Sequence, residues 1–452
     1  MEFERIIRNF LKNLKVVETF VNGVEEMILE KQKKIAPEEL NSHNIKEILK
    51  AIELVTEKDT KWEEKIEEIN QNLLDCNIEV EMDENGKKSF KIISKDDVAT
   101  GLSKSLDHIN STNNQVKMIF ESSLISLAVY FELLVTSLIH ERLNEYPEAM
   151  NIDKKSLTIS EIEELGSLEE AKNYLIEREV INLMHSGFKD WLIYFKTNMK
   201  VPLIRIENLV EDINEVFNRR NLFVHGGGLV NNIYLKKVHN DLKINVKKGD
   251  RLFVNDHYLM KTINNFRHFG IILALEVWKT LEKKSKDRPK ITNNFIVDML
   301  LETTEWKLIK DLCDFLINDN DVPESLKWQS KINYWLAMKK LGEFEKVSKE
   351  VRSADFSAFT KDFQLCQLAL LDDYDNFFIL LEGAYPNSIT LAELEDWPVF
   401  NEIRNQEKYK VMINKENPQE ENTIDQAEEE KEKDKIPEPN ILERNKVEEP
   451  AL

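Results

Sequence analysis

The sequence predicts an all-α protein that carries only minor β-hairpins. Glycine and proline are scarce, with 12 and 11 in 452 residues, so few positions break a helix. Hydrophobic and charged residues make up 42% and 32% of the chain, a balance typical of helices with one apolar and one charged face. Over long segments the apolar residues also recur at intervals of three and four, which is the helical period.

Residues 1–112 are expected to form an N-terminal helical region with one β-hairpin. The helical period covers three segments, residues 3–34, 42–56 and 60–74. Between residues 76 and 94 apolar residues alternate on both sides of an Asn85-Gly86 turn, the pattern of a hairpin. A hairpin of this size is not stable alone, so we expect it to pack on helices. The region shows no catalytic constellation and could bind a partner or extend a dimer interface.

Residues 113–285 are expected to form a helical bundle. Its centre would be the segment 124–143, which is apolar on nearly every side. We consider this run too short for a membrane span, and Glu132 interrupts it. The remaining expected elements are helices at 168–184, 188–199, 205–224 and 257–284, and a short hairpin at 244–254 around Lys248-Gly249-Asp250.

The helix at 205–224 leads into the most informative stretch of the chain, Arg220-Asn221-Leu222-Phe223-Val224-His225, which three glycines follow. Arg220 stands where the apolar stripe calls for another apolar residue, so its guanidinium needs a partner. Glu132 is a candidate partner for Arg220 or Arg219, although it could equally point to solvent. The glycines supply a helix stop, which makes His225 one of the last helical residues.

The Arg220, Asn221 and His225 pattern resembles the motif of the HEPN superfamily, whose active members are ribonucleases, and these residue types suit RNA cleavage. The nucleophile is the ribose 2′-OH, which the protein must deprotonate while it stabilises the phosphate and protonates the leaving 5′-oxygen. The imidazole of His225 can transfer protons, and the guanidinium of Arg220 offers paired donors to phosphate oxygens. Asn221 can hydrogen-bond the phosphate or hold His225 in place. The sequence contains no metal-binding motif and no phosphate-binding loop, so we expect neither a metal nor a cofactor.

The Arg-x4-His pattern of Arg220 and His225, with Asn221 after the arginine, resembles the motif of the HEPN superfamily. The resemblance covers residues 115–284. It implies an HEPN-type helical bundle with metal-independent ribonuclease activity, RNA as substrate, and a homodimer whose two motif helices form one cleft. It also suggests a toxin in microbial defence or stress response, such as abortive infection. A structural arginine paired with a neighbouring acid would give the same pattern, and resemblance of fold does not prove catalysis.

The net charge of −21 argues against non-specific RNA coating, because proteins that coat RNA are basic. Residues 416–452 hold 13 acidic and 5 basic residues, a net charge of −8 that leaves −13 for the rest. RNA contact would then be confined to a small basic site near the motif. Arg219, Lys236 and Lys237 are candidates, although each could equally be a solvated surface residue. The low apolar content of residues 416–452 predicts a disordered acidic tail.

Residues 291–412 are expected to form a domain of repeated helical hairpins. The stretch Leu341-Gly342-Glu343-Phe344 has a counterpart 30 positions later in Leu371-Asp372-Asp373-Tyr374, and each follows an apolar helical run. Both resemble the turn inside a tetratricopeptide-like hairpin. The region could bind a protein regulator or only complete the fold.

The three cysteines, Cys76, Cys313 and Cys366, have neither disulfide-like nor metal-ligand spacing. With no signal peptide at the start of the chain, they favour a cytoplasmic protein. The resemblance therefore leads us to expect a dimeric HEPN-type endoribonuclease. The alternative is a non-catalytic HEPN scaffold whose helical repeat binds a protein partner.

Overall fold

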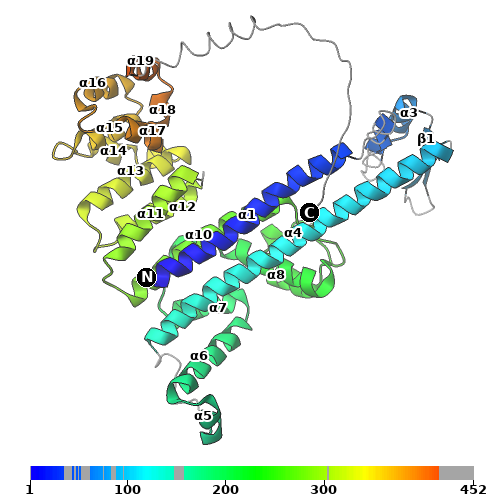
Figure 1. Cartoon of the computed structure of the whole chain (residues 1–452), viewed down its shortest axis with the longest axis horizontal. Helices are drawn as coiled ribbons and strands as arrows, with labels where there is room; N and C mark the ends of the chain where they lie inside the picture. The colour runs from blue at the N-terminus through cyan, green and yellow to red at the C-terminus, as the bar shows by residue number, and fades with distance from the viewer. Residues whose placement is uncertain are drawn as a thin grey trace, which may run out of the picture. The chain divides into compact units, whose positions relative to one another are not determined.

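The computed structural model describes residues 2–34, 43–44, 47–48, 50–51, 62–74, 76–82, 88–94, 96–146, 157–302 and 305–416 (Figure 1). Apart from one two-stranded sheet, all regular elements in these ranges are helices, which confirms the all-α class. The chain divides into two compact units, Met1–Asn294 and Phe295–Leu452, here called unit 1 and unit 2. The motif lies in unit 1.

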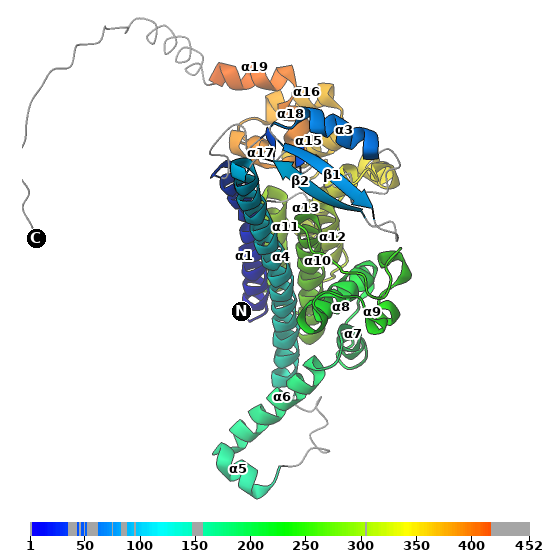
Figure 2. The same ribbon diagram turned by 90° about the vertical axis from the view of Figure 1, so that its right-hand side faces the viewer.

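Three long helices form the centre of unit 1: α1 (Glu2–Lys34), α4 (Asp96–Glu145) and α10 (Asp256–Leu281). They lie side by side along much of their length (Figures 1 and 2). Phe131 of α4 is fully buried among aromatic rings from several helices, with its centroid 6.2 Å from that of Phe10 and 4.7 Å from that of Phe266. The segment expected at the centre of the bundle therefore lies there.

The N-terminal region belongs to the same compact unit as the helical bundle. Ile7, Phe10 and Leu14 form one buried face of α1, and this face packs against α4 and α10. The expected boundary near residue 112 falls inside α4, which is one continuous helix of 50 residues. A long amphipathic helix must bury its apolar face, and here the bundle core supplies the partner.

The N-terminal hairpin is present. Strands β1 (Cys76–Met82) and β2 (Lys88–Ser94) pair antiparallel, with Ile78 opposite Ile92, as the alternating pattern requires. The hairpin packs on α3 (Trp62–Asn72), where the Asn70 amide exchanges two hydrogen bonds with the backbone of Ile78. The predicted turn at Asn85-Gly86 and most of the predicted helix at 42–56 lie outside the described residues.

The length argument against a membrane span was wrong, because the apolar run is part of a much longer helix. Within α4, residues 111–145 are long enough and apolar enough to cross a membrane. Half of the most apolar window is buried inside the protein, and α4 packs against α1, α6, α8 and α10. This packing is that of a core helix and is compatible with a soluble protein.

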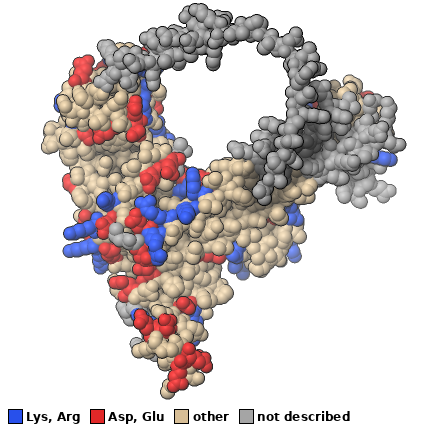
Figure 3. Space-filling model, in the orientation of Figure 1, with Lys and Arg blue, Asp and Glu red and all other residues tan. Residues whose placement is uncertain are grey.

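The remaining elements of unit 1 precede and follow the motif along the chain. The elements in order are α5 (Ile159–Leu165), α6 (Leu168–Met184), α7 (Phe188–Thr197), η3 (Ile204–Leu209), α8 (Val210–Gly226), α9 (Asn232–Lys237) and η4 (Asn240–Leu242). Helices α6 and α7 have nearly the bounds that periodicity predicts. The motif helix opens as a 3-10 turn, η3, and becomes α-helical only at Val210. The acidic side chains of α5 gather at one end of this unit (Figure 3).

The predicted hairpin at 244–254 is wrong. These residues form no strand pair with one another; instead they fold back onto the segment after α8. The Val230 amide donates to the Asp250 carbonyl at 2.9 Å, and the Leu252 amide donates to the Gly228 carbonyl at 3.0 Å. The turn at Gly249 exists, but Leu252 is buried beside Leu222, so the segment pairs with the residues that follow α8.

Unit 2 is a series of short helices: α11 (Asp287–Glu302), which begins in unit 1, then α12 (Trp306–Ile317), α13 (Glu324–Lys340), η5 (Phe344–Lys346), α14 (Ser348–Ser353), α15 (Lys361–Leu370), α16 (Tyr374–Ala384), α17 (Leu391–Asp396), η6 (Pro398–Phe400), α18 (Asn401–Arg404) and α19 (Glu407–Glu416). The two predicted turns have the same geometry. Gly342 and Asp372 both adopt positive φ, at 74° and 57°. The amides that follow them donate to Met338 and Leu368 in equivalent helices.

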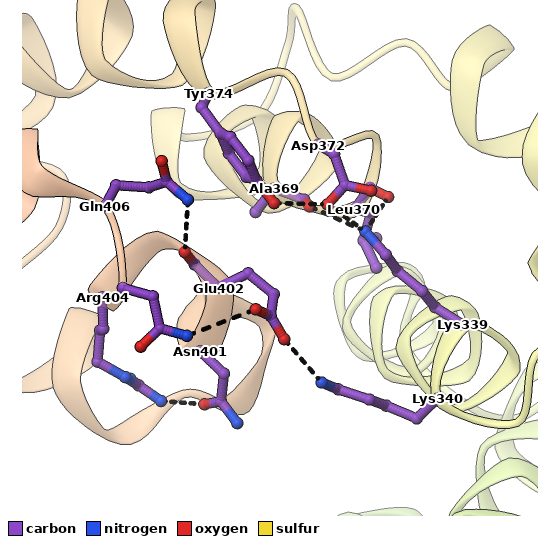
Figure 4. A network of polar contacts seen from close by, with 11 residues as sticks. Lys339, Lys340, Ala369, Leu370, Asp372, Tyr374, Asn401, Glu402, Arg404 and Gln406 are labelled. Atoms are coloured by element: carbon purple, nitrogen blue, oxygen red, sulfur yellow. Dashed lines mark hydrogen bonds and ion pairs between the residues drawn. The ribbon is translucent and has the colours of Figure 1, made fainter.

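A lysine joins the two hairpins of unit 2. Lys339 of α13 donates to the Leu370 carbonyl at 2.8 Å and pairs with the Asp372 carboxylate at 2.7 Å (Figure 4). Lys340 pairs with Glu402 of α18 at 3.3 Å (Figure 4). The repeated turns are therefore packed against each other rather than being isolated loops. The predicted acidic tail lies outside the described residues beyond Glu416.

Candidate active site around the motif helix

The glycine triplet ends α8 as the sequence predicts. Gly227 and Gly228 both have positive φ, at 58° and 82°, and the Gly228 amide donates to the Leu222 carbonyl at 3.0 Å. A Cβ at Gly228 would lie 2.7 Å from a ring carbon of Phe223, so this position requires glycine. His225 is the last residue but one of α8 and is exposed. The helix stop therefore leaves the imidazole at the open end of the helix.

Arg220 forms the ion pair for which the sequence offered Glu132 as a candidate. Its Nη2 lies 3.5 Å from Glu132 Oε1, and its Nη1 donates to Asn221 Oδ1 at 3.1 Å. The two charged side chains are 23% and 29% exposed, so each is half-shielded from water. The Nε of Arg220 is buried and has no hydrogen-bond partner among the described residues. The pair is loose, and the guanidinium keeps donors for a further ligand.

The pKa of the Glu132 carboxyl is raised above its ordinary value. Burial disfavours the carboxylate and is the larger effect; the positive charge of Arg220 lowers the pKa but does not cancel the burial. Ionisation of Glu132 at neutral pH therefore costs folding stability, and the attraction of Arg220 offsets only part of that cost. Strained electrostatics of this kind are typical of functional sites.

The motif residues open into one pocket of about 610 Å³ between α4, the α6–α7 corner and α8. Arg220, Asn221, His225 and Glu132 all line it, so the structure brings together the residues that the sequence singled out. Its inner wall is the aromatic core, formed by Phe188, Trp191 and Phe217. Buried aromatic residues cannot shift easily, so the polar groups are mounted on a rigid wall.

Sequence reasoning missed a second imidazole in this pocket. His185, the C-cap residue of α6, also lines it and is exposed. It lies 40 positions before His225, and no local spacing connects the two. Only the packing of the α6–α7 corner against α8 brings them to one cavity.

Arg219, adjacent to Arg220, has a different environment. Its Nε donates to Glu215 Oε1 at 2.7 Å, and its guanidinium lies 4.1 Å from the ring centroid of Tyr258. The hydroxyls of Tyr234 and Tyr258 also donate to the buried Glu215 carboxylate, each at 2.6 Å. Through these contacts Arg219 stabilises the packing of α8 against α9 and α10. We therefore leave it out of any RNA-binding surface.

Lys236 and Lys237 remain candidates for such a surface. Both are exposed in the last turn of α9, which packs against α8. Neither lines the motif pocket, so they could contact only the flanking part of a bound strand. In the part of the chain that the structure describes, no cluster of three histidine, cysteine or acidic residues could hold a metal ion.

Comparison with known proteins adds no assignment. No family model matches this chain, and searches of curated proteins and of solved structures return no significant match.

Proposed function

We propose that this protein is a metal-independent endoribonuclease of the HEPN type. The observation that carries the proposal is the meeting of Arg220, Asn221 and His225 in one open pocket, with Glu132 beside the guanidinium. Each residue has a chemical role in cleavage by the ribose 2′-OH. The same pocket has a rigid aromatic wall, which holds these groups in fixed relation.

The reaction would run as an in-line displacement at phosphorus. His225 transfers a proton, as general base towards the 2′-OH or as general acid towards the 5′-oxygen. Arg220 donates hydrogen bonds to the phosphate oxygens as negative charge builds up on them. Asn221 fixes the guanidinium through its Oδ1 and presents its amide to the phosphate. The O2′–P bond forms and the P–O5′ bond breaks, which leaves a 2′,3′-cyclic phosphate and a 5′-hydroxyl.

The protein would act as a homodimer in the cytoplasm of a microbe, in defence or stress response. The HEPN resemblance suggests the homodimer and the role in defence or stress response. Exposed apolar residues near the site support a covering partner: Val129 and Leu133 flank Glu132 on α4, and Val224 precedes His225. Apolar side chains that are about half exposed around a polar pocket are typical of an interface.

The second candidate is a scaffold without catalysis. The paired turns of unit 2 at Gly342 and Asp372 favour it, because stacked helical hairpins commonly bind protein partners. In this case Arg220 and Glu132 would only brace the bundle.

One experiment separates the two candidates. Total RNA is incubated in EDTA with purified wild type, His225→Ala, Arg220→Ala and the control His257→Ala, whose exposed histidine does not line the pocket. We expect cleavage by the wild type and the control only, with cyclic phosphate ends. Cleavage that leaves 3′-hydroxyl and 5′-phosphate ends would refute the mechanism. A wild type that binds a protein partner but cuts no RNA would favour the scaffold.

A further inference from the structure

The position of His185 is fixed by the same aromatic core that carries the motif helix. The corner between α6 and α7 is held by the Trp191 indole, which donates to the Leu183 carbonyl at 3.0 Å. The Phe188 and Trp191 rings then pack on Phe217 of α8, with centroids 5.5 and 5.2 Å away. Phe217 lies one helical turn before Arg220, so the corner and the motif form one rigid assembly.

The His185 imidazole is available to bind a ligand. It is exposed and has no hydrogen-bond or ion-pair partner among the described residues, although its backbone amide donates to Ile181. The His225 ring is likewise exposed and unpaired within the described part of the chain. Besides the two imidazoles, the charged side chains that line the pocket are Glu132 and Arg220, which pair with each other.

Cleavage by the 2′-OH needs two proton transfers at opposite sides of the phosphorus. One group takes the 2′-OH proton as O2′ attacks, and another gives a proton to O5′ as the P–O5′ bond breaks. One imidazole cannot do both in a single step, because it must start the step either neutral or protonated. A pocket with two imidazoles and one guanidinium supplies base, acid and phosphate clamp together.

We propose that His185 is the second acid–base residue of this pocket, so that each protomer holds both imidazoles that the reaction needs. This inference rests on the proposed RNA cleavage. It adds a second acid–base residue to the proposed site, because the motif alone would leave the second proton transfer to another protomer.

The test uses the full-length protein and two substrates in EDTA. One is a ribodinucleotide, and the other carries sulfur in place of its bridging 5′-oxygen. On the normal substrate we expect His185→Ala and His225→Ala each to lower kcat/KM by about 10²- to 10⁴-fold. A thiolate leaves without a proton, so the sulfur substrate should restore the wild-type rate to the variant that lacks the acid. The variant that lacks the base should stay slow on both substrates.

The outcomes separate this proposal from the proposed function. If the wild type cleaves neither substrate, RNA cleavage is refuted and the role of His185 with it. If the wild type is active and His185→Ala keeps the full rate, the second imidazole plays no part and the proposal is overturned. Rescue of both variants, or of neither, would also overturn a division of the two transfers.

Controls keep a folding defect apart from a catalytic one. Both histidines are exposed, so their alanine variants should unfold at the wild-type urea midpoint. His257→Ala removes an exposed histidine outside the pocket and should keep the wild-type rate. A readout without turnover is the NMR titration of the histidine rings with an oligonucleotide that carries a 2′-deoxy residue at the cleavage position. Both the His185 and His225 signals should shift, whereas a shift of His225 alone would contradict the proposal.

Discussion

Two neighbouring arginines of α8 form two glutamate pairs that should respond oppositely to the same substitution. Arg219 and Glu215 are 2.7 Å apart and almost buried, with 15% and 6% of their side chains exposed. Arg220 and Glu132 are 3.5 Å apart and more open. We predict that Glu215→Gln lowers stability, whereas Glu132→Gln leaves stability intact and lowers activity.

The magnitudes follow from the two environments. At 3.5 Å the gross attraction between Arg220 and Glu132 is about 5 kcal/mol for an effective dielectric constant of about 20. Desolvation of the carboxylate outweighs the effect of Arg220 on it, because the pKa of Glu132 stays above its ordinary value. A neutral glutamine should therefore change the free energy of unfolding at pH 7 by less than about 1 kcal/mol, or raise it.

Glu215 accepts from Arg219 and from two tyrosine hydroxyls. A glutamine has one acceptor oxygen, so at least one buried donor loses its partner and the guanidinium loses its counterion. We expect a loss of about 3 kcal/mol. The assay is urea unfolding by circular dichroism, with the unit 1 transition assigned by hydrogen exchange of α8 peptides.

Activity completes the comparison of the two variants. If the protein cleaves RNA as proposed, Glu132→Gln should lower kcat/KM for RNA about tenfold or more, because the guanidinium proposed to bind the phosphate loses one of the groups that position it. The pH dependence has a definite sign. The raised pKa means that the cost of ionised Glu132 grows as pH rises through that pKa, so Glu132→Gln should gain stability over wild type from acidic to neutral pH. A Glu132→Gln variant that unfolds more than about 1 kcal/mol earlier than wild type at pH 7 would refute the reasoning.

Three further predictions concern stability. Burial and a neighbouring carboxylate raise the pKa of Tyr258, so the contribution of its protonated hydroxyl to folding stability should be lost as pH rises above about 10. The wild type should therefore unfold at a lower urea concentration at pH 11 than at pH 8, and Tyr258→Phe should show a smaller difference between the two pH values. Gly228→Ala should cost about 2 kcal/mol from its positive φ and the ring beneath it, whereas Gly226→Ala, which meets open space, should be neutral or stabilising in thermal unfolding. Lys339→Met should speed hydrogen exchange in the α15–α16 hairpin, because its link to Asp372 is lost, and leave unit 1 peptides unchanged.

Local elements of this protein could be predicted from the sequence because their causes are local. Apolar periodicity predicts the bounds of α6, and the offset of 30 residues predicts two turns with the same backbone geometry at Gly342 and Asp372. The helix stop after His225 follows from the glycines, since only glycine adopts two successive positive φ values without steric cost. The predicted hairpin at 244–254 failed because its pairing is not local: residues 249–252 pair with residues 228–230 and not with one another.

The sequence could predict only part of the candidate site. The sequence by itself indicated that Arg220, Asn221 and His225 belong together, because they lie within six residues at one helix end. Adjacent helical residues point about 100° apart, so only the packing decides that Arg219 braces α9 and α10 while Arg220 faces the pocket. Tertiary structure alone brought His185 to that pocket from another helix, because an aromatic core joins the two helices and no spacing in the chain records its shape.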